Sequence, residues 1–354
     1  MEIAAVRAAL PGHRHTQAEI TDAFAALIAQ GDLDEQVLRR FHANAGVKTR
    51  HLALPLAEYA GLGGFGQAND LFLEHAVALG SQALAEALKA ADLTPTDVDQ
   101  LFCATVTGLA VPSLDARIMT ILGMRPDVRR VPLVGLGCVA GAAGVARMHD
   151  YLLGHPDHVA ALVTVELCSL TLQREDLSLP NLVASGLFGD GAAAVVARGT
   201  GSGDGSVEVV DTRSRLYPDS ERVMGFDVSE RGLQIVLDAR VPTIVRRYLR
   251  ADVDDFLAAH GLRRSDIGWW VCHPGGPKVI DAVRDALEVD EQALAMTRAS
   301  LSAVGNLSSA SVLCVLEDTL RERPPAPGSH GVLLAMGPGF CSELVLLRAT
   351  AEQA

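Results

Sequence analysis

Short apolar segments alternate with longer segments of helical periodicity along this chain, and the alternation stops once and then begins again. The break is GTGSGDGS at 199–206, in which seven of eight residues are Gly, Ser or Thr. Strands that alternate with helices predict βαβ units and a largely parallel, buried sheet. We therefore expect a duplicated α/β fold whose halves are residues 1–200 and 201–354.

The expected elements follow from the local periodicity. In the first half we expect a helical arm (17–30 and 33–45), a loop at 55–66, further helices at 69–91, 113–122 and 140–153, and strands at 100–105, 131–136, 158–165 and 191–197. In the second half we expect strands at 207–211, 268–272, 331–336 and 342–348, helices at 240–260 and 276–287, and a helix start at 305–314.

Composition excludes several classes of function. The chain is 49% hydrophobic and 21% charged, which argues against disorder. A formal net charge of −13 argues against nonspecific nucleic-acid binding. No run of 18 apolar residues and no signal peptide is present, so we expect a cytoplasmic protein without membrane insertion. The six cysteines form no CxxC pair and indicate no disulfide framework.

Cys138 lies where an apolar strand is expected to stop and a helix to start, in VPLVGLGCVAGAAG. Unpaired N–H groups and the helix dipole lower the pKa of a thiol at such a position. Gly137, Gly141 and Gly144 keep the surroundings small enough for a thioester to approach. The segment therefore indicates a nucleophile suited to reversible acyl carriage. A buried structural cysteine is the alternative.

Two further residues have the chemistry that such a nucleophile needs. His273 ends an apolar strand in WWVCHPGGPK, and Asn306 precedes a Ser- and Ala-rich helix in GNLSSAS. Taken singly, the first fits a structural histidine and the second an N-cap or turn asparagine. At the ends of separate elements of one α/β fold, Cys138, His273 and Asn306 together predict a Cys–His–Asn site.

The segments GLGCVAGAAG, GLFGDGAAAVV, HPGGPK, GNLSSAS and MGPGFCSELVLLR resemble those of the chalcone-synthase-like, or type III, polyketide synthases, in the same order over nearly the whole chain. VELCSLTLQ and SRLYPDSERVMGFDV resemble bacterial alkylpyrone and alkylresorcinol synthases. The resemblance implies a thiolase-like fold with α-β-α-β-α layers. It also implies a homodimer that works without metal, other cofactor or carrier protein.

The resemblance implies acyl loading on Cys138, with His273 and Asn306 as catalytic partners. It implies that Phe188 is the gatekeeper between a CoA tunnel and the reaction cavity, and that the turn around Pro338 shapes the cavity wall. The resemblance places Ile235 where the plant enzymes have a second large cavity phenylalanine. It places Thr107, Cys168 and Leu172 near the positions that open an acyl tunnel in long-chain members, and the bulky Leu172 could shorten that tunnel. Thr171 is a further position implied for the cavity wall.

For binding the CoA phosphates, Arg40 alone matches a basic residue of the family. Other family cations align with Val37 and Asn44, so Lys48 or Arg50 is expected to substitute.

The function so implied is iterative. An acyl-CoA starter, expected to be a medium- or long-chain aliphatic one, is loaded on Cys138 and extended by decarboxylative condensation with malonyl-CoA, and the chain closes to an alkyl-α-pyrone or alkylresorcinol. One alternative is a single-condensation ketoacyl synthase of fatty-acid initiation. Others are a type III synthase with a short or malonyl starter, and a catalytically silent acyl-CoA-binding subunit, against which the intact Cys–His–Asn set argues.

Overall fold

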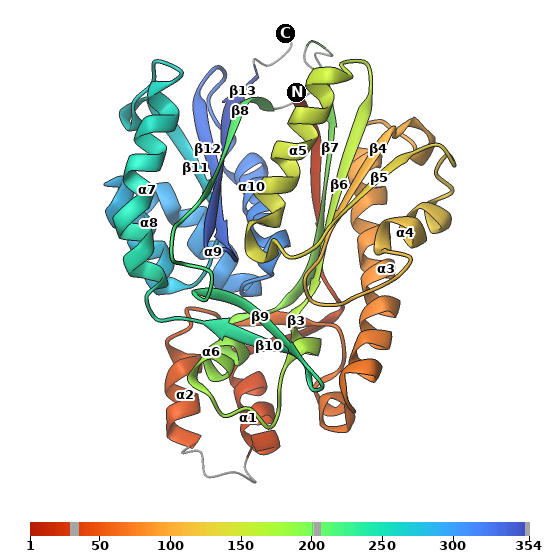
Figure 1. The fold of residues 1–354 in the computed structure, drawn as a ribbon, viewed down its shortest axis with the longest axis vertical. Coiled ribbons are helices and arrows are strands. Elements are labelled where there is room, and N and C mark those ends of the chain that lie inside the picture. The colour runs from red at the N-terminus through yellow and green to blue at the C-terminus, as the bar shows by residue number, and fades with distance from the viewer. Residues whose placement is uncertain (29–34, 200, 202–206, 351–354) are drawn as a thin grey trace.

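The computed structural model describes residues 1–28, 35–199, 201 and 207–350 (Figure 1). Its main sheet has nine strands in the order β11-β12-β13-β8-β1-β7-β6-β4-β5. Their bounds are β1 (Glu2–Ala9), β4 (Gln100–Ala104), β5 (Arg129–Leu133), β6 (Val159–Leu167), β7 (Asp190–Arg198), β8 (Val207–Leu216), β11 (Ile267–Cys272), β12 (His330–Gly337) and β13 (Cys341–Ala349). Because β1 and β8 pair through only two residue pairs, the sheet consists of two parts that meet at this junction.

The two parts repeat one arrangement. The order β1-β7-β6-β4 corresponds to β8-β13-β12-β11, and in both the first two pairings are antiparallel and the third is parallel. The expected duplicated α/β fold is therefore confirmed. The expected largely parallel sheet is wrong, because three pairings are parallel and five antiparallel. One reason is the short turn at 338–340, which joins β12 to β13 and allows only an antiparallel pair.

Helices cover both outer faces and fill the space between the two parts of the sheet (Figure 1). Helices α3 (Phe65–Ala90) and α4 (Leu114–Leu122) lie on one outer face, and α7 (Val241–Ala258) and α8 (Pro277–Leu287) on the other. Helices α5 (Ala140–Gly154) and α10 (Ser311–Glu322) lie between. This is the α-β-α-β-α layering of the thiolase-like fold.

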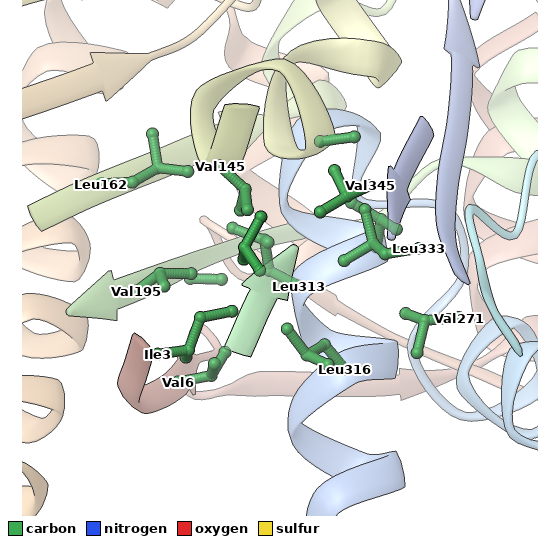
Figure 2. Packing of buried hydrophobic residues seen from close by; sticks show 14 of the residues in the cluster. Ile3, Val6, Val145, Leu162, Val195, Val271, Leu313, Leu316, Leu333 and Val345 are labelled. Carbon is green, nitrogen blue, oxygen red and sulfur yellow. The ribbon is translucent and has the colours of Figure 1, made fainter. Parts of the chain in front are cut away.

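The central layer is held by one apolar cluster that takes side chains from both halves (Figure 2). Val145 of α5 and Leu313 of α10 meet Val195 from one part of the sheet and Leu333 from the other. Each such side chain contributes about 1.5–3 kcal/mol on full burial. The halves therefore share a core.

Glycines of α5 allow this close packing. A Cβ on Gly141 would lie 2.3 Å from the carbonyl oxygen of Ser309, and one on Gly144 would lie 2.6 Å from Leu162 of β6. Gly141 thus brings α5 against the segment that follows Asn306, and Gly144 brings it against β6, so both glycines serve helix packing.

Several elements were absent from the sequence expectations. The central strand β1 was not expected, and the described parts of the helical arm are α1 (Gln17–Ile28) and α2 (Glu35–Ala43). The loop expected at 55–66 contains a 3₁₀ turn, η1 (Leu56–Gly61). The other additions are β2 (His13–Thr16), β3 (Thr49–Leu52), α6 (Leu179–Leu187), β9 (Met224–Ser229), β10 (Gly232–Leu237) and α9 (Ala295–Val304).

The expected break at 199–206 lies outside the described residues except for 199 and 201, as do the helix ends at 29–30 and 33–34. None of the helices in the described part of the chain combines the length and the apolar character that crossing a bilayer requires.

Candidate active site

Cys138 lies in a 3₁₀ turn, η3 (Gly137–Val139), between β5 and the start of α5. Gly137 has a φ of +54°, and a Cβ there would lie 2.9 Å from the ring of Pro338. The left-handed backbone and the proline contact together favour glycine before the cysteine. The Cys138 side chain is 6% exposed, and its Sγ donates to Ser308 Oγ at 3.6 Å.

Asn306 lies between α9 and the 3₁₀ turn η7 (Ser308–Ala310), and a short parallel bridge pairs it with Phe188. In this bridge Gly189 N donates to the Asn306 carbonyl at 3.0 Å, and Asn306 N donates to the Leu187 carbonyl at 2.9 Å. The side-chain Oδ1 accepts from Ser308 N at 2.8 Å. That bond orients the amide and leaves its NH₂ group as the donor for other partners.

His273 follows β11, and its backbone N–H donates to the Leu334 carbonyl at 2.9 Å. Its side chain is buried, and neither ring nitrogen has a hydrogen-bond partner among the described residues. His273, Cys138 and Asn306 line the same cavity of about 30 Å³. The three side chains predicted from separate segments are thus brought together.

Burial opposes charge on both titratable groups of this cavity. Burial raises the pKa of the Cys138 thiol to about 12. The hydrogen bonds with Ser308 and Asn306 lower this pKa, but their effect is smaller than that of burial. Burial also lowers the pKa of His273 to about 4. The expected lowering of the thiol pKa is therefore not found, because burial is the largest effect on this thiol.

A second, larger cavity of about 110 Å³ adjoins the first. Cys138 and Phe188 line both cavities, so Phe188 stands at their junction. Every predicted cavity position lies in the wall of the larger one: Thr107, Cys168, Thr171, Leu172, Phe188, Ile235 and Pro338. The structure thus collects these residues around Cys138, and their roles stay predictions.

The wall of the larger cavity also contains elements that sequence reasoning did not connect with the site. Ile20, Phe24 and Leu27 of α1 contribute apolar side chains, and α6, β9 and β10 close the same end of the molecule (Figure 1). The apolar face of α1 was visible in the sequence. What it would cover was not, because that contact depends on the fold.

Glu166 is a polar residue of the site that the sequence analysis missed. It is fully buried on β6 and accepts from Ser309 Oγ at 2.6 Å, Thr107 Oγ1 at 2.9 Å and Val106 N at 3.1 Å. Burial raises its pKa. The available signal was a glutamate in a strand whose other residues, apart from Thr164, are apolar, because a buried carboxylate must be paired with donors.

The three predicted phosphate contacts differ in placement. Arg40 on α2 and Lys48 before β3 are exposed. Arg50 is 2% exposed, and its Nη1 donates to the Phe188 carbonyl at 2.7 Å while Nε donates to Gln17 Oε1 at 3.1 Å. The expectation for Arg50 is corrected, because a guanidinium buried beneath the Phe188 segment cannot meet a phosphate in solvent.

Comparison with known proteins identifies relatives over the whole chain. Residues 1–201 match the N-terminal domain of the chalcone and stilbene synthases, and residues 208–351 match their C-terminal domain. The 1,3,6,8-tetrahydroxynaphthalene synthase of Streptomyces peucetius subsp. caesius is 58% identical over 98% of this chain and 92% of that protein.

More distant relatives carry other products in their names. The 3,5-dihydroxyphenylacetyl-CoA synthase of Amycolatopsis orientalis is 34% identical over 90% of this chain and 87% of its own length. A solved structure, 1,3,6,8-tetrahydroxynaphthalene synthase from Streptomyces coelicolor A3(2), described as a bacterial type III polyketide synthase, superimposes with a TM-score of 0.94 at 32% identity, over 99% of this chain and all of that one. None of these three is named for an alkylpyrone or alkylresorcinol, so that part of the resemblance stays a prediction.

Proposed function

We propose, because this chain belongs to the chalcone and stilbene synthase family, that it builds 1,3,6,8-tetrahydroxynaphthalene from malonyl units alone. Its family makes it a type III polyketide synthase, an acyltransferase that extends acyl groups with malonyl-CoA. The observation that carries the choice of product is the 58% identity, over nearly the full length, with a synthase of that name. All carbons of this naphthalene lie in its rings, so two-carbon units from malonyl-CoA can supply the whole skeleton.

The size of the larger cavity supports a small starter. Its volume of about 110 Å³ must hold the starter and the growing chain together, so a short starter leaves more room for the units that follow. Short acyl units on Cys138 fit such a space better than a long aliphatic chain does.

We assign the chemistry to Cys138, His273 and Asn306. Because burial opposes charge on both the thiol and the imidazole, the Cys138 proton passes to His273 as the sulfur attacks the thioester carbonyl, and the ion pair is confined to the reacting complex. The carbon–sulfur bond to CoA then breaks, and the departing CoA thiolate takes the proton from His273. His273 and Asn306 then donate to the thioester carbonyl of malonyl-CoA and stabilise the enolate that forms as carbon dioxide leaves. Loss of one such donor typically lowers kcat by about 10²–10³.

An alkyl starter is the second candidate, and the apolar wall favours it. Phe24 and Leu27 of α1 lie in the cavity wall, and each buried methylene of a fatty acyl group contributes about 0.8 kcal/mol. If long starters are used, Cys168→Phe should lower kcat/KM for long acyl-CoAs more than for short ones. An equal loss at all lengths would argue against an acyl channel at Cys168.

Binding of CoA and assembly complete the proposal. The exposed Arg40 and Lys48 are proposed to contact the CoA phosphates. A homodimer is supported by apolar side chains on the loop before α4, since Val111 is fully exposed and Leu109 is 47% exposed. Light scattering of the purified protein with Val111→Asp as a comparison tests the assembly; a wild-type monomer would contradict it.

Incubation with malonyl-CoA alone, and with added acyl-CoAs of graded length, tests the proposed product. We expect 1,3,6,8-tetrahydroxynaphthalene, identified by mass spectrometry against the authentic compound, without any added starter. Cys138→Ala is the control for product formed without acyl-enzyme. Alkylpyrones formed only when a fatty acyl-CoA is present would favour the second candidate. A single condensation would favour a ketoacyl synthase, and acyl-CoA binding without turnover a silent subunit.

A further inference from the structure

Three polar side chains outside the Cys–His–Asn set are joined in a line at the larger cavity. Tyr59 Oη lies 2.5 Å from Ser169 Oγ, and Ser169 Oγ donates to Asp190 Oδ2 at 2.5 Å. Tyr59 comes from η1, Ser169 from the 3₁₀ turn η4 (Cys168–Thr171), and Asp190 from the start of β7. The fold thus brings a phenol, a hydroxyl and a carboxylate from three distant segments into contact.

The carboxylate end of the line is held rigidly. Asp190 is fully buried, and its two oxygens also accept backbone N–H donors, from Ala53 at 2.7 Å and from Ser169 at 2.8 Å. Arg50 interacts electrostatically with it and favours the charged form, whereas burial, the larger effect, raises the pKa of Asp190 to about 6. Asp190 can therefore take up a proton without leaving its place.

Ser169 is the member of the line that is best placed to touch a substrate. Its side chain is half-buried and lines the larger cavity together with Cys138, and Tyr59 lines the same cavity. Asp190 lies behind them and does not line that cavity. A hydroxyl that faces a reaction space with a carboxylate at its back is the arrangement of a proton relay.

We propose that Ser169 is a catalytic residue for ring closure, with Asp190 as the proton acceptor behind it and Tyr59 as the residue that orients its hydroxyl. The substrate is the poly-β-ketone carried on Cys138, so the inference rests on the proposed function. It adds a second acid–base group to the site, one that serves cyclisation and leaves condensation to Cys138, His273 and Asn306.

The proton and electron balance of the step is simple. A methylene C–H bond between two carbonyls breaks, its proton goes to Ser169 Oγ, and the Ser169 hydroxyl proton goes to Asp190. The electron pair left on carbon forms the new bond to a carbonyl carbon of the same chain, whose π electrons become an alkoxide. The alkoxide takes the proton back through Ser169, so the relay returns to its starting state.

Ser169→Ala separates this role from a structural one, because the backbone N–H groups of Ala53 and residue 169 still bond the Asp190 carboxylate. Positioned general bases contribute about 10²–10⁴ in rate, so we expect the rate of aromatic product formation from malonyl-CoA to fall about a hundredfold. Acyl loading, measured as a mass shift of the protein, and carbon dioxide release should persist, with linear acids and lactones replacing the aromatic product.

Two further variants complete the test. Ser169→Thr keeps a hydroxyl and should restore the aromatic fraction, whereas Tyr59→Phe removes only the neighbouring phenol and should lower that fraction less than Ser169→Ala does. An unchanged product ratio in Ser169→Ala overturns the relay, as does an equal loss of loading, decarboxylation and cyclisation with no recovery in Ser169→Thr. If the wild type itself forms no aromatic product, the proposed function fails, and this role of Ser169 falls with it.

Discussion

Replacing Arg50 by alanine should disturb both the stability of the fold and the Phe188–Asn306 bridge. Arg50 donates to the Phe188 carbonyl and to Gln17, whose own Nε2 donates to the Gly186 carbonyl at 2.7 Å. Its stem lies close to Gly305, where a Cβ would be 3.1 Å from Arg50. The side chain therefore supports the segment before Phe188 and the residue before Asn306 together.

The cost follows from what the substitution leaves behind. The Phe188 carbonyl and Gln17 Oε1 each lose a donor in a partly buried place, at up to about 1–3 kcal/mol apiece. Removing the guanidinium also removes the cost of burying its charge, and this offsets part of the loss in stability. One of its nitrogens has no hydrogen-bond partner among the described residues. We expect a net loss of about 1–5 kcal/mol, a substantial fraction of the 5–15 kcal/mol that typically separates folded from unfolded states.

Thermal unfolding and steady-state kinetics measure the two consequences. At roughly 2–4 °C per kcal/mol for domains of 150–250 residues, and less for longer chains, Tm should fall by several degrees. kcat for malonyl-CoA decarboxylation should fall with it, because Asn306 loses its fixed position.

Arg40→Ala is the matched control, an arginine exposed on α2. Its unfolding free energy should change by no more than about 0.5 kcal/mol, while KM for malonyl-CoA rises and kcat is kept. If Arg50→Ala instead raises KM with Tm unchanged, the guanidinium reaches the CoA phosphates and the buried role assigned to it is refuted.

Three further outcomes are expected at the Cys–His–Asn site. Cys138→Ala should abolish the acyl-enzyme mass shift and leave Tm nearly unchanged, since one small buried side chain replaces another; polyketide formed at the wild-type rate would exclude Cys138 as nucleophile. Asn306→Ala should lower malonyl-CoA decarboxylation about 10²–10³-fold and starter loading much less, and equal losses in the two half-reactions would contradict its assignment to the enolate. Because burial raises the pKa of the Cys138 thiol to about 12, its thiolate fraction in the free enzyme should grow with pH throughout the range from 7 to 10; alkylation by iodoacetamide that levels off below pH 8 would show that the thiol is ionised near neutrality.

Much of the local structure was predictable, because local periodicity depends only on neighbouring residues. The helix at Ala140–Gly154 begins where the sequence places it, and the strands around Cys103, Val163 and Leu346 are close to their expected bounds. Strand β1 is the clearest failure. EIAAVRAA is a strand because it pairs with β7 along its length and with β8 at its start, and neither partner is near it in the chain.

The same division applies to the site. Cys138, His273 and Asn306 could be chosen from the sequence because each stands at the end of an element, next to glycines or a turn, where side chains of such elements converge. The direction of the pKa shift of the Cys138 thiol could not be predicted in this way. The helix start predicts a lowered thiol pKa, but burial of the thiol in the folded chain raises it.

By itself the sequence determined two α/β halves, a nucleophile between a strand and a helix, and the residue types of a Cys–His–Asn site, because these depend on contacts within short segments. The tertiary structure alone decided that Arg50 is buried beneath the Phe188 segment, that α1 closes the cavity, and that Tyr59, Ser169 and Asp190 meet. Burial and hydrogen-bond partners are set by residues more than a hundred positions apart in several of these contacts, and one-dimensional patterns do not encode which distant segments will pack together.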